Sequence, residues 1–410
     1  VIMELLNKPV LTINNIKDNI SFNMEIDNHI PKSVLNIEIN DKLNKYKSMI
    51  DNTNIKIWDF CKKLSNEYEL LHHCIRNKNT NLGIANYDPI SRAFFKLWEI
   101  CQDFNLIDDK KERLVMGALA EGPGGFIECF NFYRRRYCKK LDDNVNCITL
   151  KPYNNDIPGW KKSHRIFREC WKYNICYGQD GTGNLYKLDN IKDYMKLFRY
   201  NRADLVTGDG GFDFSNDYSN QEVYAFRLIF CEAVTGLTIL KLGGHMVLKI
   251  FDILHQSTID LLYILSTYFG KIHIVKPFTS RSANSEKYIV CKNFLGISEE
   301  NLESLYNIIN ELEIINQQKK FVKRIISNQI DTQFLDLINS SNIYFISKQI
   351  KSLIKGLAFV KEKLNNEDIN EIKKIQTIYS LAWCKKYDFP INNRCRYLKD
   401  TNNYNYIPNF

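Results

Sequence analysis

The stretch "ALAEGPGGFIECF", residues 118–130, joins a short apolar run to a helical pattern through Gly122-Pro123-Gly124-Gly125. Glycine lets the backbone approach a ligand closely, and the following helix presents free N–H groups and a positive dipole end to an anion. The stretch is neither a Gly-x-Gly-x-x-Gly dinucleotide fingerprint nor a P-loop, because no Gly-Lys-Ser/Thr follows. It predicts the first strand–turn–helix unit of an α/β sheet. The turn could hold the carboxylate of a methionine-like ligand, with Glu121 accepting hydrogen bonds from the same ligand.

Short apolar runs on both sides of this stretch alternate with helical patterns, which is typical of an α/β fold with a mostly parallel sheet. We expect strands at 116–120, 147–151, 172–177, 204–207, 245–251, 272–275 and 287–291, and helices at 125–137, 191–198, 221–242 and 257–269. The last two strands have too few residues between them for a crossover helix, so they should pair antiparallel. A mostly parallel sheet with an antiparallel last hairpin is the layout of class I (Rossmann-like) methyltransferases.

The rest of the chain predicts helical N- and C-terminal extensions to this domain. We expect a mostly helical extension over residues 1–80, with a helix at 57–74, and the catalytic domain over 81–295. Residues 296–410 should form a helical region with periodic runs at 302–312 and 350–364, and an irregular tail rich in Asn and Tyr. The function of this region is open between RNA binding, docking of a partner and support of the sheet.

The composition is that of a soluble globular protein, with 410 residues, 44% hydrophobic and 25% charged. No stretch approaches the ~18 consecutive apolar residues of a membrane span, so we expect no membrane association. The 12 cysteines are scattered without a CxxC spacing, which favours free thiols and an intracellular location. The net charge of +9 favours a polyanionic partner without demonstrating one.

Two lysines and two carboxylates are candidates for a site. Lys96 lies in a helical pattern before the glycine loop, Asp209 and Lys249 lie in or after predicted strands, and Glu286 precedes the last strand. Ligands of open α/β sheets bind beyond the carboxyl ends of the strands, so Asp209 and Lys249 should converge there. Each residue alone could be a solvated lysine, a turn former or a salt-bridge partner. The four together at one end of one sheet favour a site.

These residue types suit proton removal from an alcohol. We expect a desolvated lysine beside a second lysine to have a lowered pKa and to act as a base near neutral pH, with carboxylates orienting it. Such a base could take the proton of a weakly acidic hydroxyl as an electrophilic methyl group arrives in line. Glu286 would fix the lysine. The chemistry needs no metal, and the sequence offers no cluster of metal ligands.

The order Lys96, "EGPGGF" (121–126), "DGGF" (209–212), Lys249, Glu286 resembles the FtsJ/RrmJ-like 2′-O-ribose methyltransferases and their Lys-Asp-Lys-Glu tetrad. More narrowly, "DGTG", "NQE", "GGHMVLKIFD" and "KPFTSRSANSEKYIVCK" are similar to the eukaryotic and large-DNA-virus enzymes that methylate the first transcribed nucleotide of capped mRNA. The resemblance covers residues 87–293. It implies S-adenosyl-L-methionine as methyl donor, a ribose 2′-hydroxyl as acceptor, and capped mRNA as partner.

The resemblance also implies roles for single residues. Lys249 would be the base, and Lys96, Asp209 and Glu286 would complete the tetrad. The cofactor would be held by Glu121, Gly122, Pro123, Gly124, Gly125, Phe126, Asp180 and Gly181. The RNA would be contacted by Ser219, Asn220 and Asn284, and by Arg281, whose charge suits a phosphate. A methylated guanine would need an aromatic partner, for which Trp58, Trp98, Trp160, Trp171 and Tyr87 are candidates.

Two departures from the family pattern stand out. Ala118 occupies the place of an aspartate found in many relatives, and Lys151 follows the second strand where an acid would hold the cofactor ribose. The alternatives to formation of a cap 1 structure are a ribosomal or transfer RNA 2′-O-methyltransferase, a non-catalytic RNA-binding subunit, and a methyltransferase for protein or small molecules. A capping enzyme or RNA polymerase is a further expected partner. The location is undecided between the nucleus and the cytoplasm, including a viral factory or virion.

Overall fold

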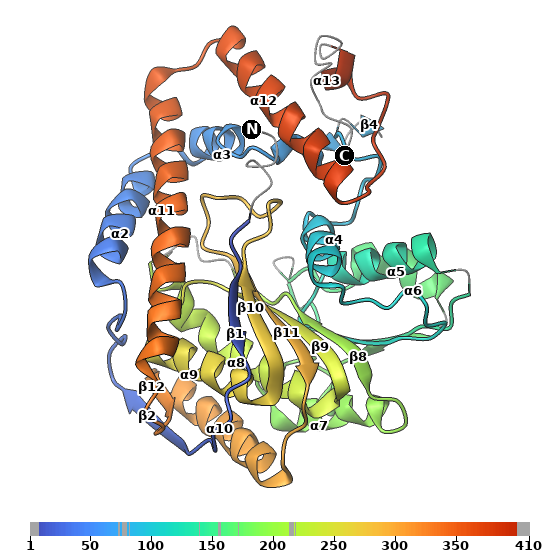
Figure 1. Cartoon of the computed structure of the whole chain (residues 1–410), viewed down its shortest axis with the longest axis vertical. Coiled ribbons are helices and arrows are strands. Elements are labelled where there is room, and N and C mark those ends of the chain that lie inside the picture. The colour runs from blue at the N-terminus through green and yellow to red at the C-terminus, as the bar shows by residue number, and fades with distance from the viewer. Residues whose placement is uncertain are drawn as a thin grey trace.

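The computed structural model has one central sheet with helices on both faces (Figure 1). It describes residues 8–72, 74–75, 80–81, 83–138, 140–154, 157–170, 172–212, 217 and 219–399. The eight strands of the main sheet lie in the order β1 (Leu11–Asn14), β10 (Phe269–Val275), β11 (Lys287–Phe294), β9 (Leu240–Ile250), β8 (Ala203–Gly208), β5 (Val115–Leu119), β6 (Asn144–Ile148) and β7 (Tyr173–Cys176).

The strand directions confirm the predicted fold class. β7, β6, β5, β8 and β9 run parallel to one another. β11 runs antiparallel to both β9 and β10, so the predicted hairpin is confirmed and its second strand inserts between β9 and β10. β1 adds an antiparallel edge strand beyond β10. This is the mostly parallel sheet with an antiparallel edge of class I methyltransferases.

Helices cover the two faces of the sheet because strand side chains alternate between them. Along β5, Met116 and Ala118 pack into one buried cluster, and Val115 and Leu119 pack into the other. The first cluster includes side chains from α4 (Ala93–Phe104), α5 (Gly125–Tyr137) and the end of α12 (Asn366–Lys386). The second includes α7 (Leu188–Met195), α8 (Gln221–Ile239), α9 (Gln256–Tyr268) and α10 (Glu299–Gln317).

Several elements differ from the predicted bounds. The predicted helix at 57–74 ends at Leu64, where α3 (Ile55–Leu64) gives way to a short 3-10 turn, Glu69–Leu71. The predicted helix at 221–242 ends three residues early, because Leu240 begins β9 and pairs with Ala203. The strand predicted at 147–151 is β6, which begins at Asn144 and ends at Ile148. Residues 149–151 therefore lie beyond the carboxyl end of this strand.

The two terminal regions pack on each other. β2 (Phe22–Asp27) pairs antiparallel with β12 (Phe321–Ile326), and α11 (Thr332–Glu362) contacts both α2 (Ile37–Asp51) and α3. The N-terminal region is therefore less helical than expected, since it also supplies β1 to the main sheet. The predicted boundaries at residues 80 and 295 stay predictions, and the predicted tail at 400–410 lies outside the described residues.

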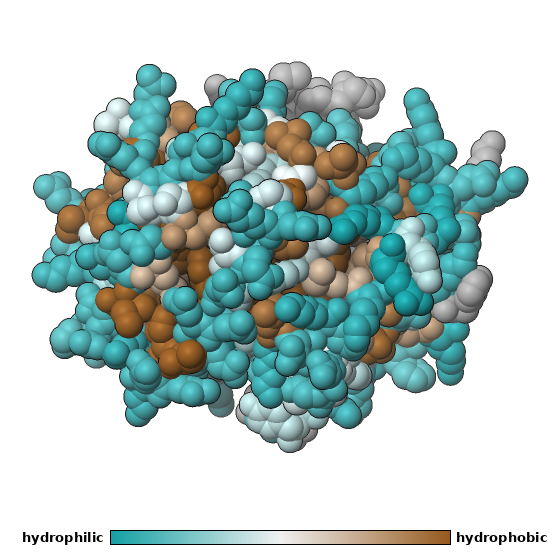
Figure 2. Space-filling view, turned by 90° about the horizontal axis from the view of Figure 1, so that it is seen from below, coloured by the Kyte–Doolittle hydropathy of each residue, from teal (hydrophilic) through white to brown (hydrophobic). Residues whose placement is uncertain are grey.

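The remaining described elements are β3 (Cys74–Ile75), β4 (Thr80–Asn81), α6 (His164–Glu169), α13 (Arg396–Lys399) and the 3-10 turns Lys161–Ser163 and Lys196–Phe198. Of the helices described, none combines the length and apolar character needed to cross a membrane. The face seen from below is mostly hydrophilic, with hydrophobic side chains in separate groups (Figure 2).

Candidate active site

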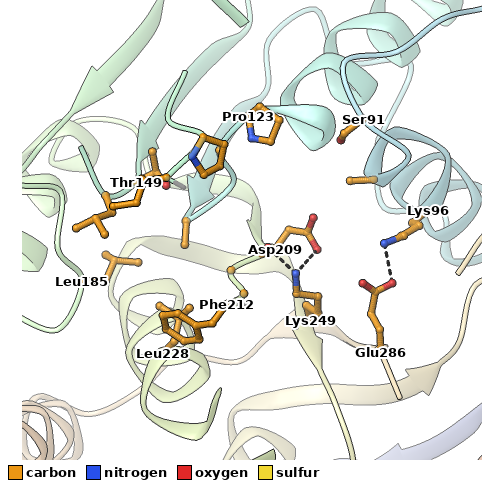
Figure 3. A pocket seen from close by; sticks show the side chains of 18 of the residues that line it. Ser91, Lys96, Pro123, Thr149, Leu185, Asp209, Phe212, Leu228, Lys249 and Glu286 are labelled. Carbon is orange, nitrogen blue, oxygen red and sulfur yellow. Dashed lines mark hydrogen bonds and ion pairs between the residues drawn. The ribbon is translucent and has the colours of Figure 1, made fainter. Parts of the chain in front are cut away.

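A cavity of about 750 Å³ opens beyond the carboxyl ends of β5, β6, β8 and β9. Ligands of open α/β sheets bind at this edge. All four residues of the predicted tetrad, Lys96, Asp209, Lys249 and Glu286, line the cavity. Figure 3 shows them as two ion pairs. The structure therefore confirms the predicted convergence of these side chains.

The first pair joins Lys249 of β9 to Asp209, which follows β8. The Nζ of Lys249 donates to the main-chain oxygen of Asp209 at 2.8 Å and lies 3.3 Å from its Oδ1. The hydroxyl of Tyr288 donates to the same Oδ1 at 2.9 Å. Asp209 is thus held by β11 as well as by its own strand, and it holds Lys249 through both backbone and side chain.

The second pair joins Lys96 of α4 to Glu286, just before β11. The Nζ of Lys96 lies 2.7 Å from Oε1 of Glu286, and Ser280 Oγ donates to the same oxygen at 2.9 Å. Burial alone would raise the pKa of Glu286, but Lys96 and then Lys249 lower it to about 2. Glu286 is therefore a fixed negative charge beside both lysines, and these two cations compensate its burial at the start of β11.

The pKa of Lys249 differs from expectation. Burial lowers it, but Asp209, then Glu286 and Glu232, outweigh burial and hold the pKa above its ordinary value. The expectation of a lowered pKa was wrong because the second lysine, Lys96, is paired with Glu286, and because the sequence did not indicate Glu232 as a neighbour. Lys249 is therefore charged in this arrangement.

Glu232, on α8, lies under the loop that follows β8. Its Oε1 accepts from the main-chain N–H of Gly210 at 3.1 Å, and its Oε2 has no partner within the described part of the chain. Burial raises the pKa of Glu232 to about 8. Nothing in the sequence pattern distinguishes this glutamate from others on a helix.

The glycine loop has the close packing that its sequence predicts. A Cβ at Gly122 would lie 2.9 Å from the main-chain oxygen of Gly159, and Gly124 has a φ of 106°, a region that favours glycine. Gly122 and Pro123 line the cavity, while Phe126 is buried behind it. The loop therefore brings its backbone at Gly122 and Pro123 against the cavity.

The residues around the part of the cavity next to the glycine loop fit S-adenosylmethionine. Leu150, Leu185 and Leu228 supply apolar wall for a flat base, and the loop before α5 suits a carboxylate. Glu121 is buried, its Oε1 accepts from Thr207 Oγ1, and its Oε2 has no partner among the described residues. The amino group of such a ligand would donate a hydrogen bond to this unpartnered oxygen of Glu121.

Other predicted cofactor residues do not line the cavity. Asp180 accepts from the N–H of Thr182 at 2.9 Å, from Asn190 at 2.9 Å and from Lys187 at 2.7 Å. Its carboxylate therefore organises its own turn, and the Gly183–Tyr186 segment lines the cavity instead. The cofactor contacts of Asp180, Gly181, Gly124, Gly125 and Phe126 stay predictions.

The predicted RNA contacts divide into two groups. Arg281 and Asn284 line the cavity, but Arg281 already makes a two-pronged contact with Glu69, at 3.0 Å and 2.7 Å. Ser219 and Asn220 lie at the start of α8, where their N–H groups donate to Asp217, and neither is among the described lining residues. Their RNA contacts stay predictions.

Arg92 is a cavity residue that the sequence reasoning missed. It lies 3.6 Å from Glu69 and donates to the main-chain oxygen of Thr279 at 3.3 Å. Because Arg281 shares the same glutamate, two guanidinium groups face one carboxylate at the cavity wall. The signal was present, since Arg92 stands four residues before Lys96 and such a pair shares one helix face.

Lys276 was also missed, although it opens the motif "KPFTSRSANSE". Its Nζ donates at 2.8 Å to the main-chain oxygen of Asn284, to Asn284 Oδ1 and to the main-chain oxygen of Glu286. Burial, and then the neighbouring Lys287, lowers its pKa well below the ordinary value. It ties the loop between β10 and β11 into the shape that positions Glu286.

The predicted aromatic clamp is mostly buried. Trp98 is fully buried, and Trp58 and Trp160 are each 5% exposed, so these rings belong to the core rather than to an open base-stacking site. Tyr87 is half-buried, and its hydroxyl donates to Glu128 at 2.9 Å. Trp171 lies outside the described residues.

The chain is similar to known proteins over this region. Residues 89–294 match the model of the family described as FtsJ-like methyltransferase, and the four tetrad residues fall in that range. A cap-specific mRNA (nucleoside-2′-O-)-methyltransferase 1 of Dictyostelium discoideum is 30% identical in an alignment of 400 positions that covers 88% of this chain and 50% of that protein.

Two zebrafish (Danio rerio) proteins are also similar. One is named cap-specific mRNA (nucleoside-2′-O-)-methyltransferase 1 and is 28% identical over 309 residues, 73% of this chain and 36% of that protein. The other is named cap-specific mRNA (nucleoside-2′-O-)-methyltransferase 2 and is 30% identical over 265 residues, 62% of this chain and 34% of that protein. The chain thus spans half or less of the length of these relatives.

Proposed function

Since the chain belongs to the FtsJ-like methyltransferase family, we propose that it methylates the ribose 2′-hydroxyl of the first transcribed nucleotide of capped mRNA. The family uses S-adenosylmethionine, which the cavity fits and which supplies an electrophilic methyl group and a positive charge when bound. The names of the similar proteins support the substrate. One observation carries the chemistry: Lys249 is held by Asp209 at the cavity wall, beside the Lys96–Glu286 pair.

In this proposal Lys249 removes the proton of the hydroxyl. A lysine can do so only as the free amine, and the three carboxylates around Lys249 oppose that form. The pKa of Lys249 would be lower with a positively charged methyl donor bound in the same cavity, and the free amine would then be favoured. Asp209 keeps Nζ in place, so proton removal and in-line approach occur from a fixed geometry.

Lys96 and Glu286 have a supporting role. The Lys96 Nζ is paired with a carboxylate whose pKa is about 2, so Glu286 keeps its negative charge across the working pH range. Together with Ser280, they fix the wall against which the ribose lies. Arg92 and Arg281 share Glu69, which leaves one excess positive charge on this wall for a phosphate of the RNA.

The substrate is tested by supplying labelled S-adenosylmethionine with matched RNAs that carry a guanosine cap, an N7-methylguanosine cap or a plain triphosphate. The proposal predicts label on the first nucleotide that depends on the cap. Equal labelling of the triphosphate RNA would contradict cap specificity and move the ribose chemistry to another class of RNA. No label on any RNA, despite binding, would favour a non-catalytic subunit. The expected capping-enzyme or polymerase partner and the cellular location stay predictions.

A further inference from the structure

A second cavity, of about 370 Å³, lies behind the loop that connects β10 to β11. Alternate residues of this loop face the two cavities: Thr279 and Arg281 line the active-site cavity, whereas Phe278, Ser280 and Ser282 line the second one. In Figure 1 the loop points into the angle between α11 and α12. One loop is therefore the shared wall of both cavities.

The second cavity is strongly basic. Its described lining includes Lys8, Lys276, Lys348, Lys351 and Lys355, with Glu67 as the only carboxylate among them. We call it the lysine cavity. Such an excess of one charge in a hollow attracts and concentrates ligands of the opposite charge.

Three of these lysines have no carboxylate partner among the described residues, although Lys348 and Lys355 lie over the rings of Tyr344 and Phe359. Lys8 is paired with Glu99 and Asp103, and Lys276 donates to the loop. Lys348, Lys351 and Lys355 are exposed, and no carboxylate of the described residues lies within 4.0 Å of their ammonium groups. Their charges are therefore uncompensated within the described part of the chain.

The three lysines form a row. They stand at spacings of three and four residues on α11, which places them on one face along about 10 Å of helix. Ser352 lies on the same face and lines the same cavity, and its buried Oγ has no partner among the described residues. A buried hydroxyl normally has a hydrogen-bond partner. A ligand in this cavity could supply the hydrogen bond that the Ser352 hydroxyl lacks.

We propose that the lysine cavity binds backbone phosphates of the RNA on the 3′ side of the methylated nucleotide, an inference that rests on the proposed function. The ammonium groups suit phosphates, and the half-buried rings of Tyr344 and Tyr379 line the same hollow and offer surfaces for bases. The shared loop favours RNA over an acidic protein segment, because the loop residues that line the lysine cavity alternate with those that line the cavity proposed to hold the first ribose.

The loop also connects the two cavities chemically. Ser280 lines the lysine cavity and donates to Glu286, and Lys276 lies 3.4 Å from Ser280 Oγ. Phosphates in the lysine cavity thus lie next to the hydrogen bonds that fix the active-site wall. RNA beyond the first nucleotide should therefore increase affinity without entering the active-site cavity.

The test compares the unaltered chain with the triple variant Lys348→Gln/Lys351→Gln/Lys355→Gln. The binding of a long capped RNA, and of a capped RNA cut after its first nucleotide, is measured by fluorescence anisotropy over a range of salt concentrations. We expect the triple variant to bind the long RNA about tenfold more weakly and its salt slope to fall by about 2, since each phosphate contact of a single strand contributes about 0.7. Binding of the cut RNA should stay unchanged.

The control variant is Lys42→Gln/Lys45→Gln/Lys361→Gln, which removes the same charge from exposed lysines that line neither cavity. Equal weakening by both triple variants, or of both RNAs, would overturn the site. So would unchanged RNA binding together with lost binding of a phosphorylated peptide, which would assign the cavity to a protein segment. The anisotropy measurement reports RNA binding and does not depend on catalysis. If the unaltered chain failed to methylate RNA, that result would count against the proposed function and not against the binding site.

Discussion

The ammonium group of Lys249 is held twice by one residue: it lies 2.8 Å from the main-chain oxygen of Asp209 and 3.3 Å from its Oδ1. The backbone contact depends only on the turn after β8, whereas the side-chain contact also sets the charge around the lysine. Substitution of Asp209 therefore changes the pKa of Lys249 more than its position, and the two roles can be separated experimentally.

Replacement of the base should abolish turnover. Lys249→Met keeps the length and apolar part of the side chain, so we expect kcat to fall by about 100-fold or more, the contribution of a general base. Calorimetric binding of S-adenosylmethionine should persist. Lys271→Met, at an exposed position of β10 outside the cavity lining, is the control and should keep full activity. Methylation by Lys249→Met above one tenth of the original rate would exclude Lys249 as the base.

The pH dependence of the reaction should reflect the carboxylates around Lys249. Because they raise its pKa, kcat should increase as the pH rises above neutral. Asp209→Asn removes the strongest of these charges, so the midpoint of the pH–rate profile should move to lower pH even though the maximal rate falls. A midpoint that stays in place or moves upward would contradict this account.

The Lys96–Glu286 pair should contribute to acid stability. The pKa of Glu286 is lowered from 4.5 to about 2, so its contribution is complete above the unfolded-state pKa and is lost as the pH falls through the folded-state value. The contribution is at most about 3 kcal/mol. Urea unfolding should show Glu286→Gln less stable than the original at neutral pH, with the difference narrowing between pH ~4.5 and ~2. If the difference in the free energy of unfolding stayed constant over that pH range, the lowered pKa of Glu286 would not contribute to stability.

Lys276 should act as a positioning residue for RNA. Its contacts with Asn284 and Glu286 shape the loop at the cavity wall. We expect Lys276→Met to raise the KM for capped RNA by about tenfold, roughly the loss of a charged hydrogen bond, with little change in the affinity for S-adenosylmethionine. Lys276→Arg should restore part of the loss. A purely structural role would instead weaken the binding of both ligands together.

The sequence predicted those parts of the fold that depend on neighbours along the chain. The helix after the glycine loop spans Gly125–Tyr137 as expected, because a glycine turn starts it and its apolar spacing continues to the end. The hairpin of β10 and β11 follows from the short connection between them. The convergence of Asp209 and Lys249 follows from the general position of sites in such sheets.

Features that depend on distant pairings could not be predicted. β1 joins the sheet edge next to β10, and β2 pairs with β12 about 300 residues away, and no local pattern indicates such partners. The raised pKa of Lys249 depends on Asp209, then Glu286 and then Glu232, and Glu232 reaches the site only through the packing of α8. Trp58, Trp98 and Trp160 proved to be core residues for a similar reason, since the spacing of a tryptophan does not show whether its ring faces the core or the solvent.

The central claim is that the acceptor is the 2′-hydroxyl of the first nucleotide, and removal of that one hydroxyl tests it most directly. Capped RNAs that carry a 2′-deoxy first nucleotide or a 2′-deoxy second nucleotide are incubated with labelled S-adenosylmethionine and compared with the all-ribose RNA. The account predicts that label falls to background only for the first substrate. Equal labelling of the RNA with a 2′-deoxy first nucleotide would contradict it.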